Sequence, residues 1–316
     1  MTRQVLLSWL FAFVFFTGLS VGSLMLLMAH ALTGGSWGKS LRPYLLASTS
    51  GLPLLALLAL ILLIGVPELY PWAAPKARSH DAVLQAQSWY LNRTFFTLRT
   101  VAYFAVWWLC WVQLPRRPRL AAPGLIICVL TASLAGVDWL MSLQPHWRST
   151  AFGMMLATGW TLSAAALAIL WATGPANSRI SPALCNDLGS LLLALLLGWS
   201  YLAFMQYLTV WTADLPAETA WYRPRTLTSW QLWTGFLVVF HFCIPFAALL
   251  SRWVKRRRLM LAAIAALLLI AHLANALWLV LPDAYPQALA VRWSDLAAPV
   301  VLGALWLYVV RRGVRV

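Results

Sequence analysis

Four ionisable side chains lie inside or beside long apolar runs, where charge is costly. Asp138 directly follows the apolar segment 125–137, and His146 comes eight residues later. Arg99 lies a few residues into a second run, and Asp187 lies near the start of a third. A charged side chain at membrane depth needs a partner, so such residues are functional candidates by default. Their chemical types favour proton transfer or contact with a polar ligand.

Asp138 has two interpretations. As a functional group it would accept a proton or a hydrogen bond from a ligand, with Thr131 seven residues earlier on the same helical face. As a structural group it would close a helix and pair with Arg148 or Arg99. The sequence leaves both open.

Asp187 also has a functional and a structural interpretation. Ser181 followed by Pro182 is typical of a helix N-cap with proline at the first helical position. Asp187 would then fall in the first turns, where the helix dipole stabilises a carboxylate without any catalytic role. We expect Asp138 and Asp187 at opposite depths, the placement that two proton half-channels would need.

The histidines and cysteines form no metal-binding pattern. His30 begins the stretch HALTGGSWG, and His241 and His272 lie near the middle of two different apolar runs. A buried neutral imidazole is the commoner case; a proton relay, or a haem held by two histidines, is the alternative. The four cysteines are isolated, without CxxC or CxxCH, so we expect no metal bound by this chain.

Membrane-spanning helices must position these residues. Of the 316 residues, 62% are hydrophobic and 10% are charged, against about a quarter charged in ordinary globular chains. Continuous apolar runs of about 20 residues recur along the chain, which predicts an all-α polytopic membrane protein with a single integral membrane domain, 1–316. The nine predicted spans are 5–29, 44–66, 95–114, 121–143, 151–174, 183–210, 229–251, 259–281 and 295–311.

The net charge of +15 reflects topology rather than nucleic-acid binding, because the cations gather in short loops between the spans. The side with more cations is predicted to be cytoplasmic, which places the C-terminus inside and the N-terminus outside. Segments 67–94, 138–153 and 214–225 then share the outer face. They hold most of the acids and many tryptophans, so we expect binding, docking or reaction there.

Five stretches together resemble one family. They are FTGLSVGSLMLLMAHALTGGSWG (16–38), WYLNRTFFTLRTVAYF (89–104), DWLMSLQPHWRSTAFG (138–153), DLGSLLLALLLGWSYLAFMQYLTVWTADLPAETAWY (187–222) and FCIPFAALLSRWVKR (242–256). In this order they resemble the membrane subunit designated F in the bacterial alternative complex III, a quinol:cytochrome c oxidoreductase. That protein is one of the NrfD/polysulfide-reductase-type membrane subunits.

The resemblance implies two four-helix bundles side by side, here 1–143 and 151–281, with 295–311 as a flanking helix. It implies a bacterial inner-membrane subunit that holds no metal, takes quinone or quinol as a ligand and helps to conduct protons. The implied partners are a related NrfD-like membrane subunit designated C, an outer-face iron–sulfur subunit, c-type cytochrome subunits and small membrane subunits. Iron–sulfur clusters and c-type haems would reside in those partners.

Seven positions match the family's motifs. The resemblance implies proton transfer or quinol contact for Asp138, Asp187, His146 and Arg99. It implies a place in the quinone site or the proton path for Asn92, Tyr207 and His30. A structural subunit of the same complex without its own quinone site is the alternative, and a stand-alone transporter is a weaker one. Family members usually have ten helices, and this sequence starts close to the second of them.

Overall fold

The computed structural model describes residues 2–74, 81–174 and 180–313, and these residues form helices and connecting turns without a strand. In chain order the α-helices are α1 (Arg3–Thr33), α2 (Ser36–Thr49), α3 (Leu52–Ile64), α4 (Val66–Leu69), α5 (Ala82–Ala86), α6 (Arg93–Gln113), α7 (Ala121–Trp139), α8 (Phe152–Ala172), α9 (Pro182–Ala213), α10 (Pro216–Leu227), α11 (Trp230–Leu237), α12 (Ile244–Leu250), α13 (Arg252–Arg256), α14 (Arg258–Val280) and α15 (Trp293–Gly313). Two short segments matter below: the π-helix η5 (Val238–Cys243) and the 3₁₀ turn η6 (Leu281–Asp283).

The all-α polytopic membrane architecture is confirmed. Within the described residues, eight helices are long and apolar enough to cross a membrane, and a ninth span results if α2 and α3 are counted as one bent helix. Hydropathy located the spans because continuous apolar length is what a bilayer requires. In the predicted connection 67–94, the described residues before α6 form short helical pieces, α5 among them. Segment 214–225 forms most of α10.

The predicted span 44–66 is broken. Helices α2 and α3 meet at a bend of 40° around Ser50 and Gly51. A Cβ on Gly51 would lie 2.4 Å from the indole nitrogen of Trp306, which comes from α15. The bend therefore sits where the α15 tryptophan approaches the backbone closely, and glycine gives the room for it.

Helix α1 is the centre of the molecule. Its apolar window is fully buried, and it contacts α2, α3, α6 and α7 on one side and α8 and α14 on the other. A Cβ on Gly22 would lie 2.2 Å from the carbonyl oxygen of Trp160, so α1 and α8 pack backbone to backbone there. Small residues at such crossings are the usual way for membrane helices to associate.

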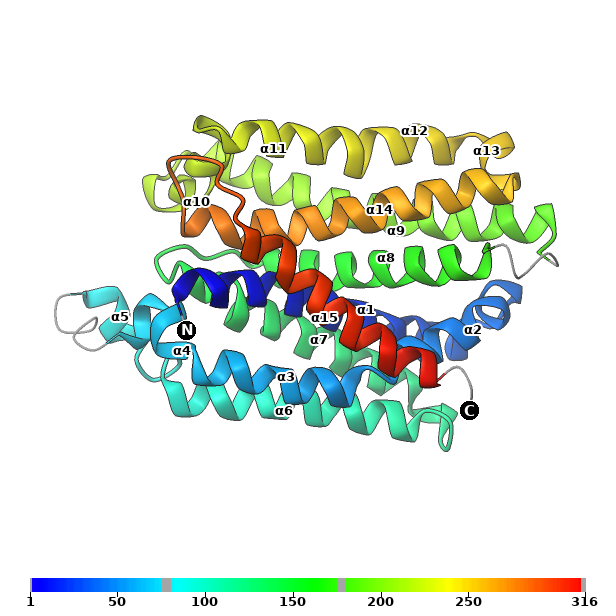
Figure 1. The fold of residues 1–316 in the computed structure, drawn as a ribbon, viewed down its shortest axis with the longest axis horizontal. Coiled ribbons are helices and arrows are strands. Elements are labelled where there is room, and N and C mark those ends of the chain that lie inside the picture. The colour runs from blue at the N-terminus through cyan, green and yellow to red at the C-terminus, as the bar shows by residue number, and fades with distance from the viewer. Residues whose placement is uncertain (1, 75–80, 175–179, 314–316) are drawn as a thin grey trace.

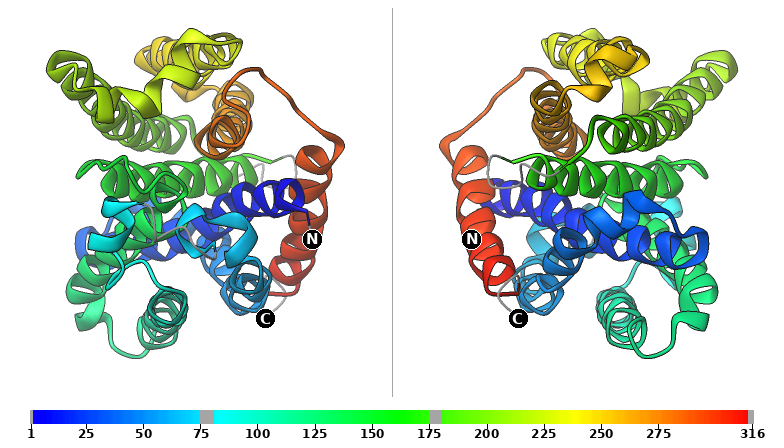
Figure 2. Two further views of the ribbon diagram at one scale, coloured as in Figure 1. Left: turned by 90° about the vertical axis from the view of Figure 1, so that its left-hand side faces the viewer. Right: turned by 90° about the vertical axis from the view of Figure 1, so that its right-hand side faces the viewer.

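Helices pack in two groups around this centre (Figure 1). Helices α1, α2, α3, α6 and α7 lie on one side, and α8, α9, α11, α12 and α14 lie on the other. Helix α15 crosses α1 obliquely and also contacts α2 and α3 (Figures 1 and 2). The C-terminal helix thus packs against the first group, and α1 and α7 join the groups through α8.

The two ends of the bundle differ in charge. The end that carries the N-terminus, α4, α5 and α10 is called the acidic end, because seven of the eight carboxylates lie there (Figure 1). These are Glu68, Asp81, Asp138, Asp214, Glu218, Asp283 and Asp295. The opposite end, with α13 and the C-terminus, is called the basic end and holds Asp187 as its acid. Segments 138–153 and 214–225 and the described parts of 67–94, residues 67–74 and 81–94, therefore share one end (Figure 1).

Candidate functional site

Asp138 and Arg99 form a bidentate ion pair between α7 and α6. The Arg99 Nε lies 2.8 Å from Oδ2 of Asp138, and its Nη2 lies 2.9 Å from Oδ1. The Asp138 side chain is fully buried and that of Arg99 is 10% exposed. Of the two structural partners that the sequence offered, Arg99 is the correct one, since Arg148 is exposed at the acidic end.

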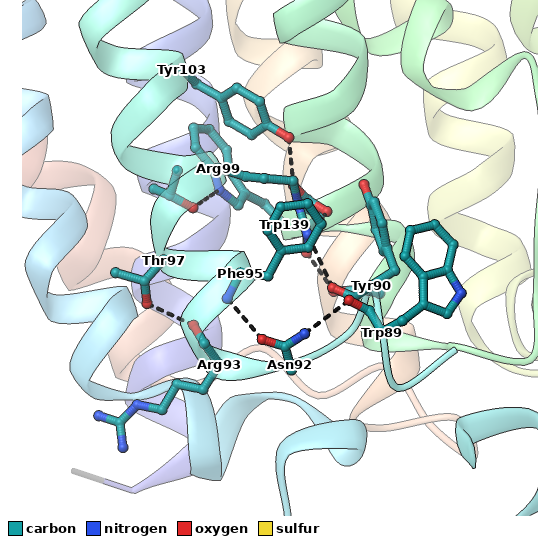
Figure 3. A network of polar contacts seen from close by, with 12 residues as sticks. Trp89, Tyr90, Asn92, Arg93, Phe95, Thr97, Arg99, Tyr103 and Trp139 are labelled. Atoms are coloured by element: carbon teal, nitrogen blue, oxygen red, sulfur yellow. Dashed lines mark hydrogen bonds and ion pairs between the residues drawn. The ribbon is translucent and has the colours of Figure 1, made fainter. Parts of the chain in front are cut away.

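Two tyrosines complete this network (Figure 3). Tyr103 lies one helical turn after Arg99, and its hydroxyl donates to Oδ2 of Asp138 at 2.6 Å. The Arg99 Nη1 donates to the Tyr90 carbonyl at 3.0 Å, and its guanidinium stacks over the Tyr90 ring at 3.8 Å. The network holds a charged pair near the membrane end without an unpaired charge.

Hydrogen bonds from aromatic side chains surround the Arg99–Asp138 network. Trp139, the next residue after Asp138, donates from its indole nitrogen to Thr100 at 3.2 Å, and its carbonyl accepts from the Tyr70 hydroxyl at 3.0 Å. Thr131 accepts from the Trp107 indole at 2.9 Å instead of facing the carboxylate. The Asp138 carboxylate therefore accepts three hydrogen bonds from the protein, of about four that its two oxygens can accept.

Asn92 is a helix cap. Its Oδ1 accepts from the backbone amide of Phe95 at 2.8 Å, and its Nδ2 donates to the carbonyl of Trp89 at 3.0 Å. The bond to Phe95 satisfies one of the free amides at the start of α6 and fixes where the helix begins (Figure 3). Asn92 therefore supports the Arg99 network through the position of α6, without touching the carboxylate.

His146 lies at the surface of the acidic end and pairs with Asp81. Its Nε2 is 2.8 Å from Oδ2 of Asp81, and its side chain is 59% exposed. Partial desolvation of Asp81 is outweighed by the amides of Leu84 and Val83 and by His146, which together hold the pKa of Asp81 below its usual value. The pair ties α5 to the turn after α7, and it is separate from the Arg99–Asp138 pair.

Tyr207 lines a groove in the second helix group. The groove has a volume of about 790 Å³ and lies between α9, α10, α11, η5 and α14. Its rim residues Tyr201 and Phe204 are exposed on the outer surface of α9. Such a volume is in the range of small-molecule sites.

The polar groups of the groove are few. Gln206 bridges Ser149 at 2.9 Å and the Tyr222 hydroxyl at 3.0 Å, so that hydroxyl accepts one bond and keeps its own proton to donate. Burial raises the pKa of Tyr222 to about 12, against the opposing effect of the Gln206 amide. Tyr207 and Asn275 also line the groove and have no side-chain hydrogen bond to the described residues. The groove thus offers a neutral O–H, an amide and a second hydroxyl within aromatic walls.

Two buried histidines lie behind the groove. The rings of His241 and His272 are 5.4 Å apart, and the His241 ring is 4.1 Å from that of Trp199, a lining residue of the groove. Both ring nitrogens of His241 and Nδ1 of His272 lack a hydrogen-bond partner among the described residues. Neither histidine belongs to a cluster of three or more metal-ligating side chains within the part of the chain that the structure describes.

Asp187 and His30 lie at the basic end, far from the Arg99 network. Asp187 is exposed on the first turns of α9, without an ion pair in the described part of the chain. The Nδ1 of His30 is 3.0 Å from the carbonyl oxygen of Gly34, and its ring packs against Trp37 at 5.2 Å. These residues do not join one site with Asp138, and the acidic-end and basic-end candidates are separated by the length of the helices.

Sequence reasoning missed several residues at the acidic end. Arg225 on α10 is fully buried and pairs with Asp283 of η6 at 2.9 Å. Gln144 donates to the same carboxylate at 3.0 Å, so the turn after α7 is tied to η6, which follows α14. Their signal was weak because they lie outside the apolar runs. Tyr103 could have been found, since it is four residues after Arg99 on the same helical face.

No protein-family model matches this chain, and no curated protein sequence matches it.

Proposed function

We propose that this chain is an integral membrane subunit of a respiratory quinol:cytochrome c oxidoreductase of the alternative complex III type, and that the groove beside Tyr207 and Asn275 takes a quinone or quinol. The assignment to this complex rests on the resemblance of the five stretches. The choice of a quinone or quinol as the ligand rests on the groove, and the groove is the observation that carries the proposal. Iron–sulfur and c-type haem subunits would receive the electrons, and a related NrfD-like membrane protein would complete the assembly.

The groove suits a flat ring with two polar ends. Trp199, Trp221 and Trp278 provide aromatic walls, and Tyr222 and Asn275 provide hydrogen bonds at separate places. The exposed rim on α9 would let an apolar tail extend into lipid. Electrons that leave a bound quinol must be matched by the release of two protons. The ring nitrogens of His241 and Nδ1 of His272, behind Trp199, lack a hydrogen-bond partner among the described residues and are free to bond to a ligand group.

The acidic end would be the docking face for the iron–sulfur subunit, and the basic end would face the cytoplasm of a bacterial inner membrane. The excess of cations at the basic end supports this orientation. The N-terminus would then be periplasmic and the C-terminus cytoplasmic.

Purification in mild detergent through a C-terminal tag tests the assignment to the complex. We expect a c-type haem spectrum and a co-purifying iron–sulfur subunit. A colourless, partner-free protein from membranes that contain those other subunits would count against the proposal and favour a stand-alone transporter.

Quinone binding is tested by two variants that remove free polar groups of the groove, Tyr207→Phe and Asn275→Leu. Each should weaken binding of a quinone analogue about fivefold, the effect of one lost hydrogen bond of about 1 kcal/mol. Tyr308→Phe is the control, because Tyr308 is exposed on α15 and outside the groove. Equal affinity in all three variants would place any quinone elsewhere.

A structural subunit without its own quinone site is the second candidate. The contacts of the Asp138 carboxylate favour it, because Arg99 and Tyr103 bind both of its oxygens and already give the group a structural role. Asp138→Asn distinguishes the roles. A proton role predicts slower quinol-dependent electron transfer in an assembled complex, and a structural role predicts normal turnover in the complexes that assemble.

A further inference from the structure

The corner between α12 and α14 carries the densest positive charge of the chain. The segment 251–258 reads SRWVKRRR and places four cations on or beside α13, with Arg258 at the start of α14. Helix α13 lies at the basic end and packs against α9 (Figure 1). Cations in such loops usually determine the membrane topology and stay in water. One cation of this segment is instead buried in the protein.

Lys255 is buried. Only 9% of it is exposed, because its methylene stem packs over Gly189 of α9. Its ammonium donates to Ser190 Oγ at 3.1 Å and has no further partner among the described residues. An ammonium has three N–H donors, so two are left for a ligand.

The charge of Lys255 has no protein counterion in the described part of the chain. The acid at the basic end, Asp187, is exposed and forms no ion pair within the described residues. Arg252, Arg256 and Arg257 are exposed around it and add positive charge. Removing an ammonium from water without a counter-charge is expensive, so this arrangement favours an external anion.

Two neighbouring features point to the kind of anion. Helix α14 starts at the same corner without a side-chain cap, so the positive end of its dipole adds to the positive charge there. Trp253 is 53% exposed and the Arg257 guanidinium stacks on it at 3.7 Å, which is typical of an aromatic residue at the lipid headgroup level. Leu250 and Leu259 flank the corner with 57% and 75% exposure, so acyl chains have apolar surface beside the cations.

We propose that this corner is a binding site for the phosphate of an anionic phospholipid, with Lys255 on the inner side of the headgroup and Arg256 and Arg257 on its outer side. The site is independent of the quinone proposal, since it lies at the other end of the bundle from Tyr222. A free phosphate shares the headgroup's chemistry. The exposed Trp253, Leu250 and Leu259 favour the lipid.

The test is native mass spectrometry of the full chain in mild detergent, with phosphatidylglycerol, phosphatidylcholine or inorganic phosphate added at equal concentration. We expect phosphatidylglycerol to be retained well above phosphatidylcholine. Lys255→Met should reduce that retention about fivefold, the effect expected of one cation near an anionic headgroup. The double variant R256Q/R257Q removes two exposed cations and should reduce retention about 25-fold, without disturbing the packing against Gly189.

The matched control is R116Q/R117Q/R119Q. It removes three exposed cations from the loop between α6 and α7, also at the basic end, and leaves Lys255 intact. Retention within about twofold of the unaltered chain is expected, because these cations lie away from the proposed headgroup site. Equal retention of the two lipids, or an equal loss in the control and the Lys255→Met chain, overturns the proposal. Displacement of the lipid by an equal concentration of inorganic phosphate overturns the lipid assignment in favour of a free phosphate ligand.

Discussion

Arg99 and Asp138 stand 39 residues apart in sequence and bind each other through both carboxylate oxygens, in a site where the carboxylate is fully buried. The pair joins α6 to α7 near the acidic end. Arg99 balances the charge of Asp138 within the protein, and the Tyr103 hydroxyl adds a third hydrogen bond to the carboxylate.

Removal of both partners of this ion pair should lower the free energy of unfolding by less than the sum of the two single removals. Arg99→Leu leaves a buried carboxylate without its cation and should lower the free energy of unfolding by about 3–5 kcal/mol. The double change with Asp138→Asn should be less damaging than the sum of the single changes, with a coupling of about 0.5–3 kcal/mol. Denaturant unfolding in detergent measures these values.

Asp187→Asn is the control for this cycle, because Asp187 is exposed and has no ion pair in the described part of the chain. It should change the free energy of unfolding by less than about 0.5 kcal/mol. Additive effects of Arg99→Leu and Asp138→Asn would show that the pair contributes little.

Tyr103→Phe should destabilise the chain by about 1.5–3 kcal/mol, since it removes a hydrogen bond to a charged group. Tyr201→Phe is the matched change, because that hydroxyl is exposed on α9. Thermal unfolding of the two variants in one detergent gives the comparison. A similar melting temperature for both would contradict the bond to Asp138.

Gly51→Ala should cost about 1–3 kcal/mol, because the new methyl group would collide with the Trp306 indole and push α15 away. Gly235→Ala places the same methyl group on α11 with nothing within 4 Å. There the higher helix propensity of alanine should stabilise by up to about 1 kcal/mol. Tryptophan fluorescence together with thermal unfolding separates displacement of Trp306 from general loosening.

The stability of the α9–α10 contact should fall at alkaline pH. The pKa of Tyr222 is raised to about 12, so the folded state keeps the proton that the unfolded chain loses near pH 10. The contribution is complete below pH 10 and is lost as the pH rises towards 12, by roughly 2–3 kcal/mol. Unfolding at about pH 9 and about pH 11.5 should show a smaller drop in Tyr222→Phe than in the unaltered chain. An identical drop in the two chains would mean that Tyr222 ionises freely.

Hydropathy alone predicted the spans well, because a bilayer imposes one length on every crossing helix. It missed the break at Gly51, although Ser50-Gly51 and Pro53 in the first turn of α3 are local signals of a helix boundary. The close approach of Trp306 to Gly51 could not be predicted, because that tryptophan is far away in the sequence. The prediction of a shared end for 67–94, 138–153 and 214–225 followed from counting spans. The contacts between Gln144 and Asp283 and between Trp147 and Trp221 show how tightly that end is joined.

The site was harder to predict than the fold. Sequence singled out Asp138 and Arg99 but could not choose between Arg99 and Arg148, because that choice depends on how α6 rotates against α7. Tyr207 was placed among the ligand-site candidates by resemblance, whereas Asn275 carried no signal in the sequence. An asparagine among apolar residues becomes notable only once a groove is seen beside it.

The π-helix η5 has a practical consequence for anyone who maps this membrane span. Pro245 cannot donate a backbone hydrogen bond, and the wider π turn before it, which contains His241, absorbs the mismatch. The extra residue of the π turn rotates α12 about its axis relative to α11. A single helical wheel drawn over 230–250 therefore assigns the residues of either α11 or α12 to the wrong face. Cross-linking or cysteine-scanning experiments on this span therefore need two separate wheels, and His241 belongs to neither.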